Sequence, residues 1–336
     1  MPDWSQVLNE IVTLQQEQLA HSMRHRSAVD QAITLVRQKY LRELAAHTTR
    51  NVIAYYSGFL SKPEFRSEIN DEDKNGFMMA VHRMKTVSGL DLILHTQGGD
   101  IASTQSIVHY LHEKFGNDIR AIVPQIAMSA GTMMACSCKE ILMGKHSNLG
   151  PIDPHLNGVP AYGVIAEFKR AANEIKRDPA KLAIWQPIIS QYRPTFLGRC
   201  ENAIRWSNRF VTDQLRTVMF DGKTTPEKKK ARQMSHSIVA KLTDYTGNKT
   251  HTRHIHIQEL QTMGLKIIPL ETKGEFEEKL QDLVLTVHHC YMHLLMNTPA
   301  YKIIENHLGA AMIKQTIEQP RTTPRFGQPN AEPLPS

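Results

Sequence analysis

The sequence predicts an α/β fold in which helices cover both faces of a mostly parallel sheet. Short apolar runs, each as long as a buried strand, alternate along the chain with segments of helical pattern. The segments between the runs are long enough for crossover helices, which parallel strands require. Apolar residues make up 41% of the chain and charged residues 22%, as in soluble globular proteins. The predicted strands are 51–56, 91–96, 119–123, 140–143 and a late one near 264–268, and the helices between them are 71–87, 102–115 and 127–138.

The N-terminal segment, residues 1–48, is predicted to be a helical arm. It is rich in Leu, Gln, Glu, Arg and Ala and has neither Gly nor Pro after Pro2, as one long amphipathic helix or a helical pair would be. Because such a helix usually packs on a neighbour, we expect the arm to serve docking or oligomerisation.

The main domain is predicted to span residues 49–300 and to carry a helical insertion at about 164–234. Prolines at 179, 187 and 194 are expected to break that insertion. A last helix is predicted over 274–296, so residues 301–336 should hold the end of this helix and a proline-rich, disordered tail from about 319 onward.

The charges and cysteines restrict the class of protein. The net charge of +7 comes from 40 Lys and Arg against 33 Asp and Glu spread along the chain, so we expect no nucleic-acid partner. The one dense run, Lys228 to Arg232, is interpreted as a solvated helix face after a cap near Thr225. Four cysteines without a CxxC pair indicate free thiols and a cytoplasmic location.

Neither a membrane span nor a secretory signal is expected. The N-terminus has no basic start followed by an apolar stretch. Residues 121–138 carry no charge, but their Pro, Gln, Ser and Gly residues favour a strand that runs into a buried helix. No GxxxxGK[ST] motif is present, so no nucleotide cofactor is expected.

Two turns each end a predicted buried strand and open a helix: Thr96-Gln97-Gly98-Gly99-Asp100 and Ala127-Met128-Ser129-Ala130-Gly131-Thr132. In open parallel sheets, ligands bind outside the carboxyl ends of the strands, so both turns should border one crevice. A serine hydroxyl at a helix start could attack a substrate carbonyl there. The N–H groups of Gly99 and Ala130 could then stabilise the resulting oxyanion. Taken alone, Ser129 is typical of a helix N-cap and a double glycine is typical of a turn, so only their pairing carries information.

Three ordered motifs give the chain a resemblance to the serine dehydrogenase proteinase family, which is related to signal peptide peptidase A and more distantly to Clp protease and crotonase. They are Leu94-His95-Thr96-Gln97-Gly98-Gly99-Asp100, Met128-Ser129-Ala130-Gly131-Thr132 and Ser147-Asn148-Leu149-Gly150-Pro151-Ile152-Asp153-Pro154. The resemblance covers about Asn51 to Leu265.

This resemblance implies a Clp/crotonase-like spiral of ββα units, with Ser129 as nucleophile and the N–H groups of Gly99 and Ala130 as oxyanion hole. It implies homo-oligomers, often rings with enclosed active sites. It also implies that the third motif shapes the substrate groove, with Gly98, Gly150, Pro151 and Asp153 as its candidate residues.

Two residues are candidates for the general base that a serine nucleophile needs. Signal peptide peptidase A uses lysine, and the matching position on the following helix resembles Lys169, which could act only if burial lowered its pKa. Clp protease uses histidine, which follows its serine at roughly the distance of His155 here, and Asp153 could orient that ring.

The function predicted from these residues is that of an ATP-independent serine endopeptidase acting on peptides or unfolded segments. A crotonase-like acyl-coenzyme A enzyme and an inactive scaffold of the same fold are the alternatives. His251, His254 and His256 have metal-like spacing but no accompanying Cys or carboxylate pattern, so structural or surface roles, and no metal, are expected.

Overall fold

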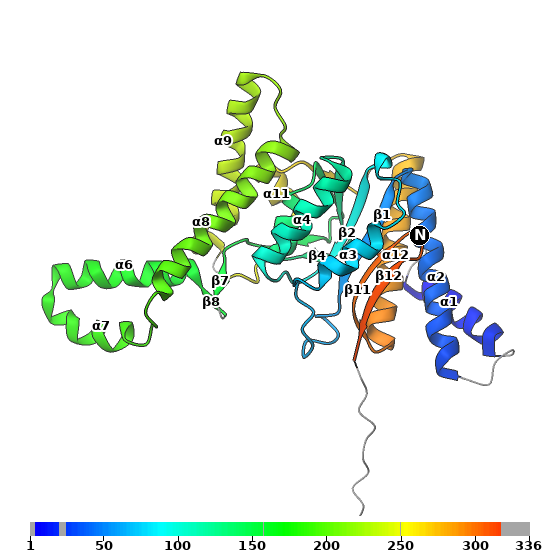
Figure 1. Ribbon diagram of the computed structural model, residues 1–336, viewed down its shortest axis with the longest axis horizontal. Helices are drawn as coiled ribbons and strands as arrows, with labels where there is room; N and C mark the ends of the chain where they lie inside the picture. Colours follow the sequence, from blue (N-terminus) through cyan, green and yellow to red (C-terminus); the bar gives the residue numbers. More distant parts are fainter. Residues whose placement is uncertain (1–3, 20–24, 157, 249, 317–336) are drawn as a thin grey trace, which may run out of the picture.

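The computed structural model describes residues 4–19, 25–156, 158–248 and 250–316, and its centre is a seven-stranded sheet (Figure 1). The strand order is β10-β5-β3-β2-β1-β11-β12, and the first five strands of this order run parallel. The predicted mostly parallel sheet is therefore confirmed, and the strands predicted at 51–56, 91–96, 119–123 and 140–143 match to within one residue at each end. The parallel strands are β1 (Asn51–Ser57), β2 (Leu90–His95), β3 (Ile119–Val123), β5 (Glu140–Met143) and β10 (Ile267–Pro269).

Alternating side chains along each strand build a separate apolar core on each face of the sheet. In β1, Ile53 and Tyr55 join one core, whereas Val52, Ala54 and Tyr56 join the other. The first core is covered by α3 (Asp73–Val81), α4 (Ile101–Phe115), α5 (Ala130–Cys136) and parts of later helices, and the second by α1 (Trp4–Leu19), α2 (His25–Thr48) and α12 (Glu275–Asn297).

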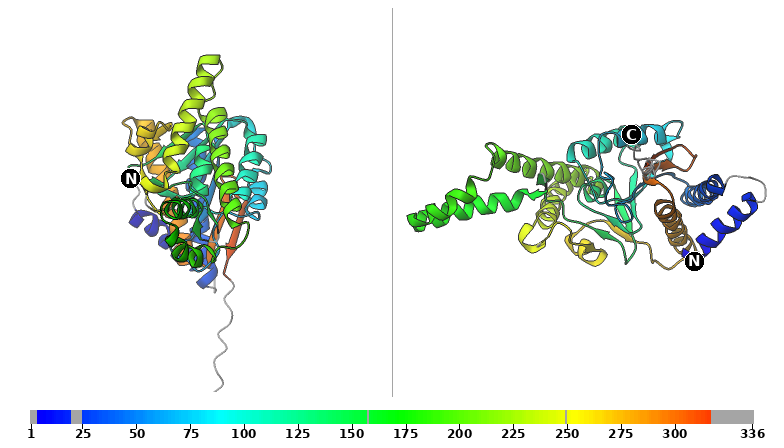
Figure 2. Two further views of the ribbon diagram at one scale, coloured as in Figure 1. Left: turned by 90° about the vertical axis from the view of Figure 1, so that its left-hand side faces the viewer. Right: turned by 90° about the horizontal axis from the view of Figure 1, so that it is seen from below.

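The predicted N-terminal helices form a pair, and the pair is attached to the body of the molecule. The view from below in Figure 2 shows α1 and α2 on the same side of the sheet as α12. Helix α2 packs against α12, and its Arg37 Nε lies 2.6 Å from Glu305 Oε2 in an ion pair that is buried on both sides.

The predicted insertion is mainly helical and extends away from the sheet. Helices α6 (Ala161–Arg177) and α7 (Leu182–Ile189) project together as a long arm (Figure 1). The expected break at Pro187 is wrong, because α7 continues through this residue. A proline removes one backbone hydrogen bond, and here the helix ends only two residues later. Pro179 instead begins a 3₁₀ turn (Pro179–Lys181), and Pro194 precedes α8 (Phe196–Gln214).

Helix α9 (Thr225–Leu242) begins one residue after its cap, which is Thr224 and not Thr225. The Thr224 hydroxyl accepts a hydrogen bond from the Glu227 N–H, and the Glu227 carboxylate accepts one from the Thr224 N–H. The side chains of Lys228, Lys229, Lys230 and Arg232 are exposed on this helix, as predicted.

The expectation that residue 301 continues a helix is wrong. Helix α12 ends at Asn297, and β11 (Ala300–Asn306) and β12 (Ala311–Gln315) form an antiparallel hairpin that extends the sheet beside β1. Lys302 and Glu305 are fully buried in β11. Because both residues are charged, the sequence of β11 lacks the apolar run that indicates a buried strand. Each charge has a buried partner, Asp73 and Arg37 respectively. The predicted disordered tail lies outside the described residues.

Within the described part of the chain, no helix is long and apolar enough to cross a membrane. The uncharged stretch 121–138 instead holds the end of β3, the short strand β4 (Ile126–Ala127) and α5. The remaining elements are β6 (Asn148–Leu149), β7 (His155–Leu156), β8 (Val159–Pro160), β9 (Ile255–His256), α10 (Tyr245–Asn248), α11 (Ile257–Met263), a 3₁₀ turn (Thr86–Ser88) and a π-helical turn (Leu215–Met219).

Candidate active site

The two glycine-containing turns lie against each other. The Thr96 N–H donates to the Ile126 carbonyl over 3.1 Å, and the Met128 N–H donates to the Thr96 carbonyl over 2.9 Å. Gly98 has a φ of +100°, and a Cβ at this position would stand 2.8 Å from the Ser129 Cβ. Only glycine allows the first turn to approach the second this closely.

Ser129 occupies the N-cap position of α5 but does not cap it. Its side chain makes no capping hydrogen bond, and its backbone has a φ of +51° and a ψ of −116°. Such a conformation costs a non-glycine residue on the order of 1–3 kcal/mol and persists only where the surroundings impose it. The interpretation of Ser129 as an ordinary N-cap is therefore wrong, and the residue is partly exposed.

Two backbone amides beside Ser129 are unpaired. Among the described residues, neither the Gly99 N–H nor the Ala130 N–H has a hydrogen-bond partner. Gly99 is held by Ile69, whose N–H donates to the Gly98 carbonyl and whose carbonyl accepts from the Asp100 N–H, each over 2.9 Å. Ala130 begins α5, where amides have no partner within the helix and the positive end of the helix dipole lies.

The segment from Ser147 to Pro154 contacts the start of α5. The Gly150 N–H donates to Thr132 Oγ1 over 3.0 Å, and a Cβ on Gly150 would stand 2.4 Å from Met128 Cε. Gly150, Pro151 and Asp153 are all buried. Gly150 is therefore packed against the Met128 side chain, with no room for a side chain of its own.

A small three-stranded sheet brings residues from distant parts of the sequence together at one end of its strands. Strands β4 and β6 are parallel, and β9 runs antiparallel to β6. The last residues of β4 and β6 and the first residue of β9 consequently lie side by side at one end of this small sheet. Ser129 follows β4 by two residues, Asp153 follows β6 by four, and His251 precedes β9 by four.

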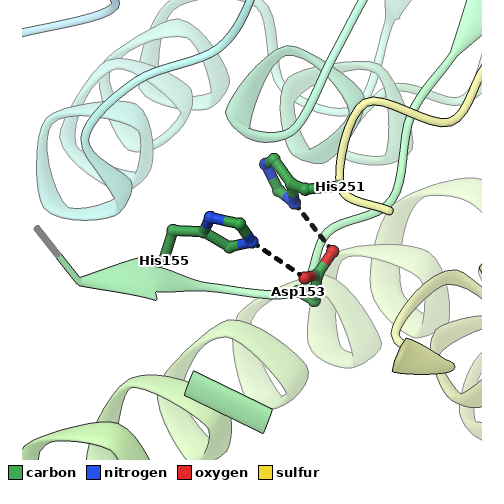
Figure 3. Close-up of side chains that lie close together, drawn as sticks. All are labelled: Asp153, His155 and His251. Carbon is green, nitrogen blue, oxygen red and sulfur yellow. Dashed lines mark hydrogen bonds and ion pairs between the residues drawn. The ribbon is translucent and has the colours of Figure 1, made fainter. Parts of the chain in front are cut away.

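Asp153 accepts hydrogen bonds from two histidines (Figure 3). His155 Nε2 lies 3.1 Å from Asp153 Oδ2, and His251 Nδ1 lies 2.7 Å from Asp153 Oδ1. The two imidazole ring centroids are 4.0 Å apart. Burial alone would raise the pKa of Asp153, but the hydrogen bonds from both rings outweigh it and hold that pKa below its ordinary value. The carboxylate is thus charged at neutral pH.

The candidate bases have different surroundings. The side chain of His155 is 28% exposed and bound to a buried carboxylate. Lys169 is exposed on α6, a helix that packs against α8 and α7, both outside the sheet. Within the single chain, Lys169 lacks the burial that a lysine base requires.

The three histidines of the His251, His254 and His256 stretch do not come together. His254 and His256 are exposed, whereas His251 points to Asp153. Sequence spacing could not indicate this partner, since the two residues meet only because β9 pairs with β6. His251 thus joins the candidate site, although the sequence pattern gave no sign of it.

Hydrogen bonds among buried side chains hold the Gly98 turn in place. Thr96 Oγ1 accepts the Gly98 N–H over 3.0 Å and lies 3.3 Å from Ser57 Oγ. His95, the residue before it, bonds through Nδ1 to the Ser57 carbonyl and lies within hydrogen-bond distance of Gln125 through Nε2. Burial lowers the pKa of His95 to about 4 despite these hydrogen bonds, so the ring is neutral at physiological pH.

Comparison with known proteins gives a family match and two relatives. A family model described as ClpP-like SDH-type serine proteinase matches residues 23–274. An uncharacterized protein of Methanocaldococcus jannaschii is 26% identical over 240 residues, which cover 70% of this chain and 74% of the relative. A second uncharacterized protein of that organism is 25% identical over 236 residues, which cover 69% and 71%.

Proposed function

The chain belongs to the ClpP-like SDH-type serine proteinase family, and from this premise we propose that it is an ATP-independent serine endopeptidase with Ser129 as nucleophile. The family predicted from the three motifs is thereby confirmed, and the match reaches beyond them into α2. Peptides or unfolded protein segments are the proposed substrates.

The observation that carries this proposal is the uncapped Ser129 hydroxyl beside two unpaired amides. An attacking Oγ would form a bond to the scissile carbonyl carbon, and negative charge would develop on the carbonyl oxygen. The N–H groups of Gly99 and Ala130 are the proposed donors to that oxyanion. The C–N bond would then break, the amine would leave with the serine proton, and water would hydrolyse the acyl-enzyme.

For the general base we propose His155, with Asp153 as the group that orients it. The Nε2 of this ring faces the carboxylate, which leaves Nδ1 to accept the Ser129 proton. A histidine can act as a base near neutral pH without burial, whereas a lysine must be buried to do so. The lysine alternative would require another molecule to cover α6.

Homo-oligomerisation is part of the proposal, and the projecting arm supports it. Helix α7 exposes Leu182, Ile184 and Ile188, of which Ile184 is 63% exposed. A second copy of the chain could cover this apolar side and remove it from water. Light scattering should give a mass at least twice the 38.2 kDa of one chain. A monomeric mass at micromolar concentration would contradict the proposed homo-oligomer.

The test of the function is covalent labelling with a serine-directed fluorophosphonate, followed by mass-spectrometric mapping of the adduct. We expect one adduct, on Ser129, and no labelling of Ser129→Ala. An intact wild-type chain without an adduct would contradict the peptidase assignment. That result would favour the acyl-coenzyme A enzyme or the inactive scaffold, which need no nucleophile at this position.

A further inference from the structure

We propose that Asp153, His155 and His251 form a binding site for one divalent transition-metal ion of the zinc class. The ligand atoms of these three side chains all lie within 4.8 Å of one another. They come from two distant segments: Asp153 and His155 lie between β6 and the start of β7, and His251 lies in the loop before β9. Figure 3 shows both rings turned toward the same carboxylate.

The distances suit an ion that would take the place of the protons in the two hydrogen bonds. Two ligands bound at about 2.0–2.1 Å to a tetrahedral zinc ion are about 3.3 Å apart. The separations here are 3.1 Å from His155 Nε2 to Asp153 Oδ2 and 2.7 Å from His251 Nδ1 to Asp153 Oδ1. Small side-chain rotations would therefore be enough to admit the ion.

The donor set favours zinc over magnesium or calcium. Imidazole nitrogen is a preferred ligand of zinc and its neighbours in the transition series, whereas magnesium and calcium prefer oxygen. Two histidines and one carboxylate leave at least one coordination position for water.

The site is reachable and well supported. The Asp153 side chain is only 5% exposed, but the His155 and His251 rings are 28% and 22% exposed, so an ion can enter from their side. The backbone around Asp153 is fixed by two hydrogen bonds, from the Ile152 N–H to the Leu242 carbonyl and from the Ala161 N–H to the Pro154 carbonyl.

Peptidase chemistry does not account for the second histidine. A carboxylate that orients a catalytic imidazole needs one ring, and here each oxygen of Asp153 faces its own ring. The centroids of the two imidazole rings are 4.0 Å apart, so both rings lie at the same carboxylate. A shared cation gives all three groups a favourable arrangement.

Ion binding would have a consequence that rests on the proposed function. If His155 Nε2 binds a metal ion, the ring can no longer take up the Ser129 proton as a neutral base. The bound ion would then hold the peptidase inactive, and its removal would release activity.

The binding test uses the full chain, freed of any purification tag and of bound metal. Titration calorimetry with zinc chloride should show that one zinc ion binds per chain with high affinity. Cobalt(II), bound in place of zinc, should show the visible absorption that is typical of a four-coordinate ion with nitrogen and oxygen ligands. His251→Gln keeps a hydrogen bond to Asp153 possible, so it tests ligation more than folding. We expect this variant and Asp153→Asn to bind zinc at least tenfold more weakly.

His254→Ala is the matched control, because His254 is exposed and lies outside the cluster. It should bind zinc as wild type does. The site is disproved if wild type binds no zinc at micromolar concentration, or if His251→Gln binds it as tightly as wild type while circular dichroism shows both folded.

Peptidase assays separate this proposal from the function itself. Zinc should inhibit wild type, a chelator should reverse the inhibition, and His251→Gln should need at least tenfold more zinc, with each protein compared with its own metal-free activity. Site-specific binding without inhibition would uphold the metal site and overturn His155 as the base.

Discussion

Gly98 lies so close to Ser129 that a single added methyl group would stand 2.8 Å from the serine Cβ. The same methyl group would be 2.6 Å from the Met128 carbonyl oxygen and 2.9 Å from the Ala130 nitrogen. The turn at Gly98, which carries the proposed donor Gly99, is therefore packed directly against both the proposed nucleophile Ser129 and the other proposed donor, the Ala130 N–H. The arrangement of the proposed site depends on the missing side chain at position 98.

Gly98→Ala should lower kcat/KM by about 100-fold or more, since a displacement of about 1 Å can have an effect of this size. The positive φ adds strain to the clash. Steady-state peptide hydrolysis on folded protein is the measurement. Gly198→Ala is the matched control, because nothing lies within 4 Å of a Cβ there, and it should be fully active. Equal activity of the two variants would contradict the proposed site.

Ser129→Ala should abolish peptidase activity and change the free energy of unfolding by less than about 0.5 kcal/mol, because no capping hydrogen bond is lost. Ser129→Gly should abolish activity as well but stabilise the fold by about 1 kcal/mol, since glycine tolerates the positive φ. Urea denaturation measures both. Asp100→Ala is the contrast: it removes a true cap, the Asp100 bond to the Ser103 N–H, and should cost about 1 kcal/mol.

His155→Ala should reduce kcat by about 10²- to 10⁴-fold, the usual contribution of a general base. Lys169→Ala should change it less than twofold, since Lys169 is exposed on α6. Single-turnover hydrolysis of a generic peptide across pH is the measurement. If the lysine variant loses activity and the histidine variant keeps it, the base is Lys169, and α6 must be covered by another copy.

Lys302→Met should destabilise the protein by about 3–5 kcal/mol, because it leaves the carboxylate of Asp73 buried without its partner. Lys302 Nζ lies 2.9 Å from Asp73 Oδ2, and both side chains are fully buried. Lys39→Met breaks an ion pair between exposed and partly exposed side chains, and should cost less than about 1 kcal/mol. Similar unfolding midpoints in urea for the two variants would contradict the role of Lys302 in holding β11.

Stability should fall as the pH is lowered from about 6.5 to about 4, partly because of His95. Its pKa is about 4 in the folded protein and about 6.5 when unfolded, so on acidification the unfolded state binds the proton first. The ring contributes up to about 3 kcal/mol of this loss, which is complete below pH 4. His95→Gln should flatten the dependence of unfolding free energy on pH in this window. An unchanged dependence would show that the ring is not kept neutral by burial.

Much of the architecture could be predicted because its causes are local. Apart from Asn51 and Arg120, the runs at 51–56 and 119–123 are apolar on both faces, as is typical of strands covered on both sides. The two glycines at 98 and 99 indicated a tight turn in which there is no space for a side chain. The hairpin after Asn297 was missed because Lys302 and Glu305 are charged, and only their distant partners make their burial possible.

The sequence by itself determined the parallel strands with the helices between them, the family, and the serine within the second of two tight turns, since each depends on neighbours along the chain. Only the tertiary structure decided that the Ser129 hydroxyl caps nothing, that Lys169 is exposed, and that His251 meets Asp153. Those outcomes depend on which distant segments lie side by side. Strand pairing between β6 and β9 sets that contact, and residue spacing alone carries no record of it.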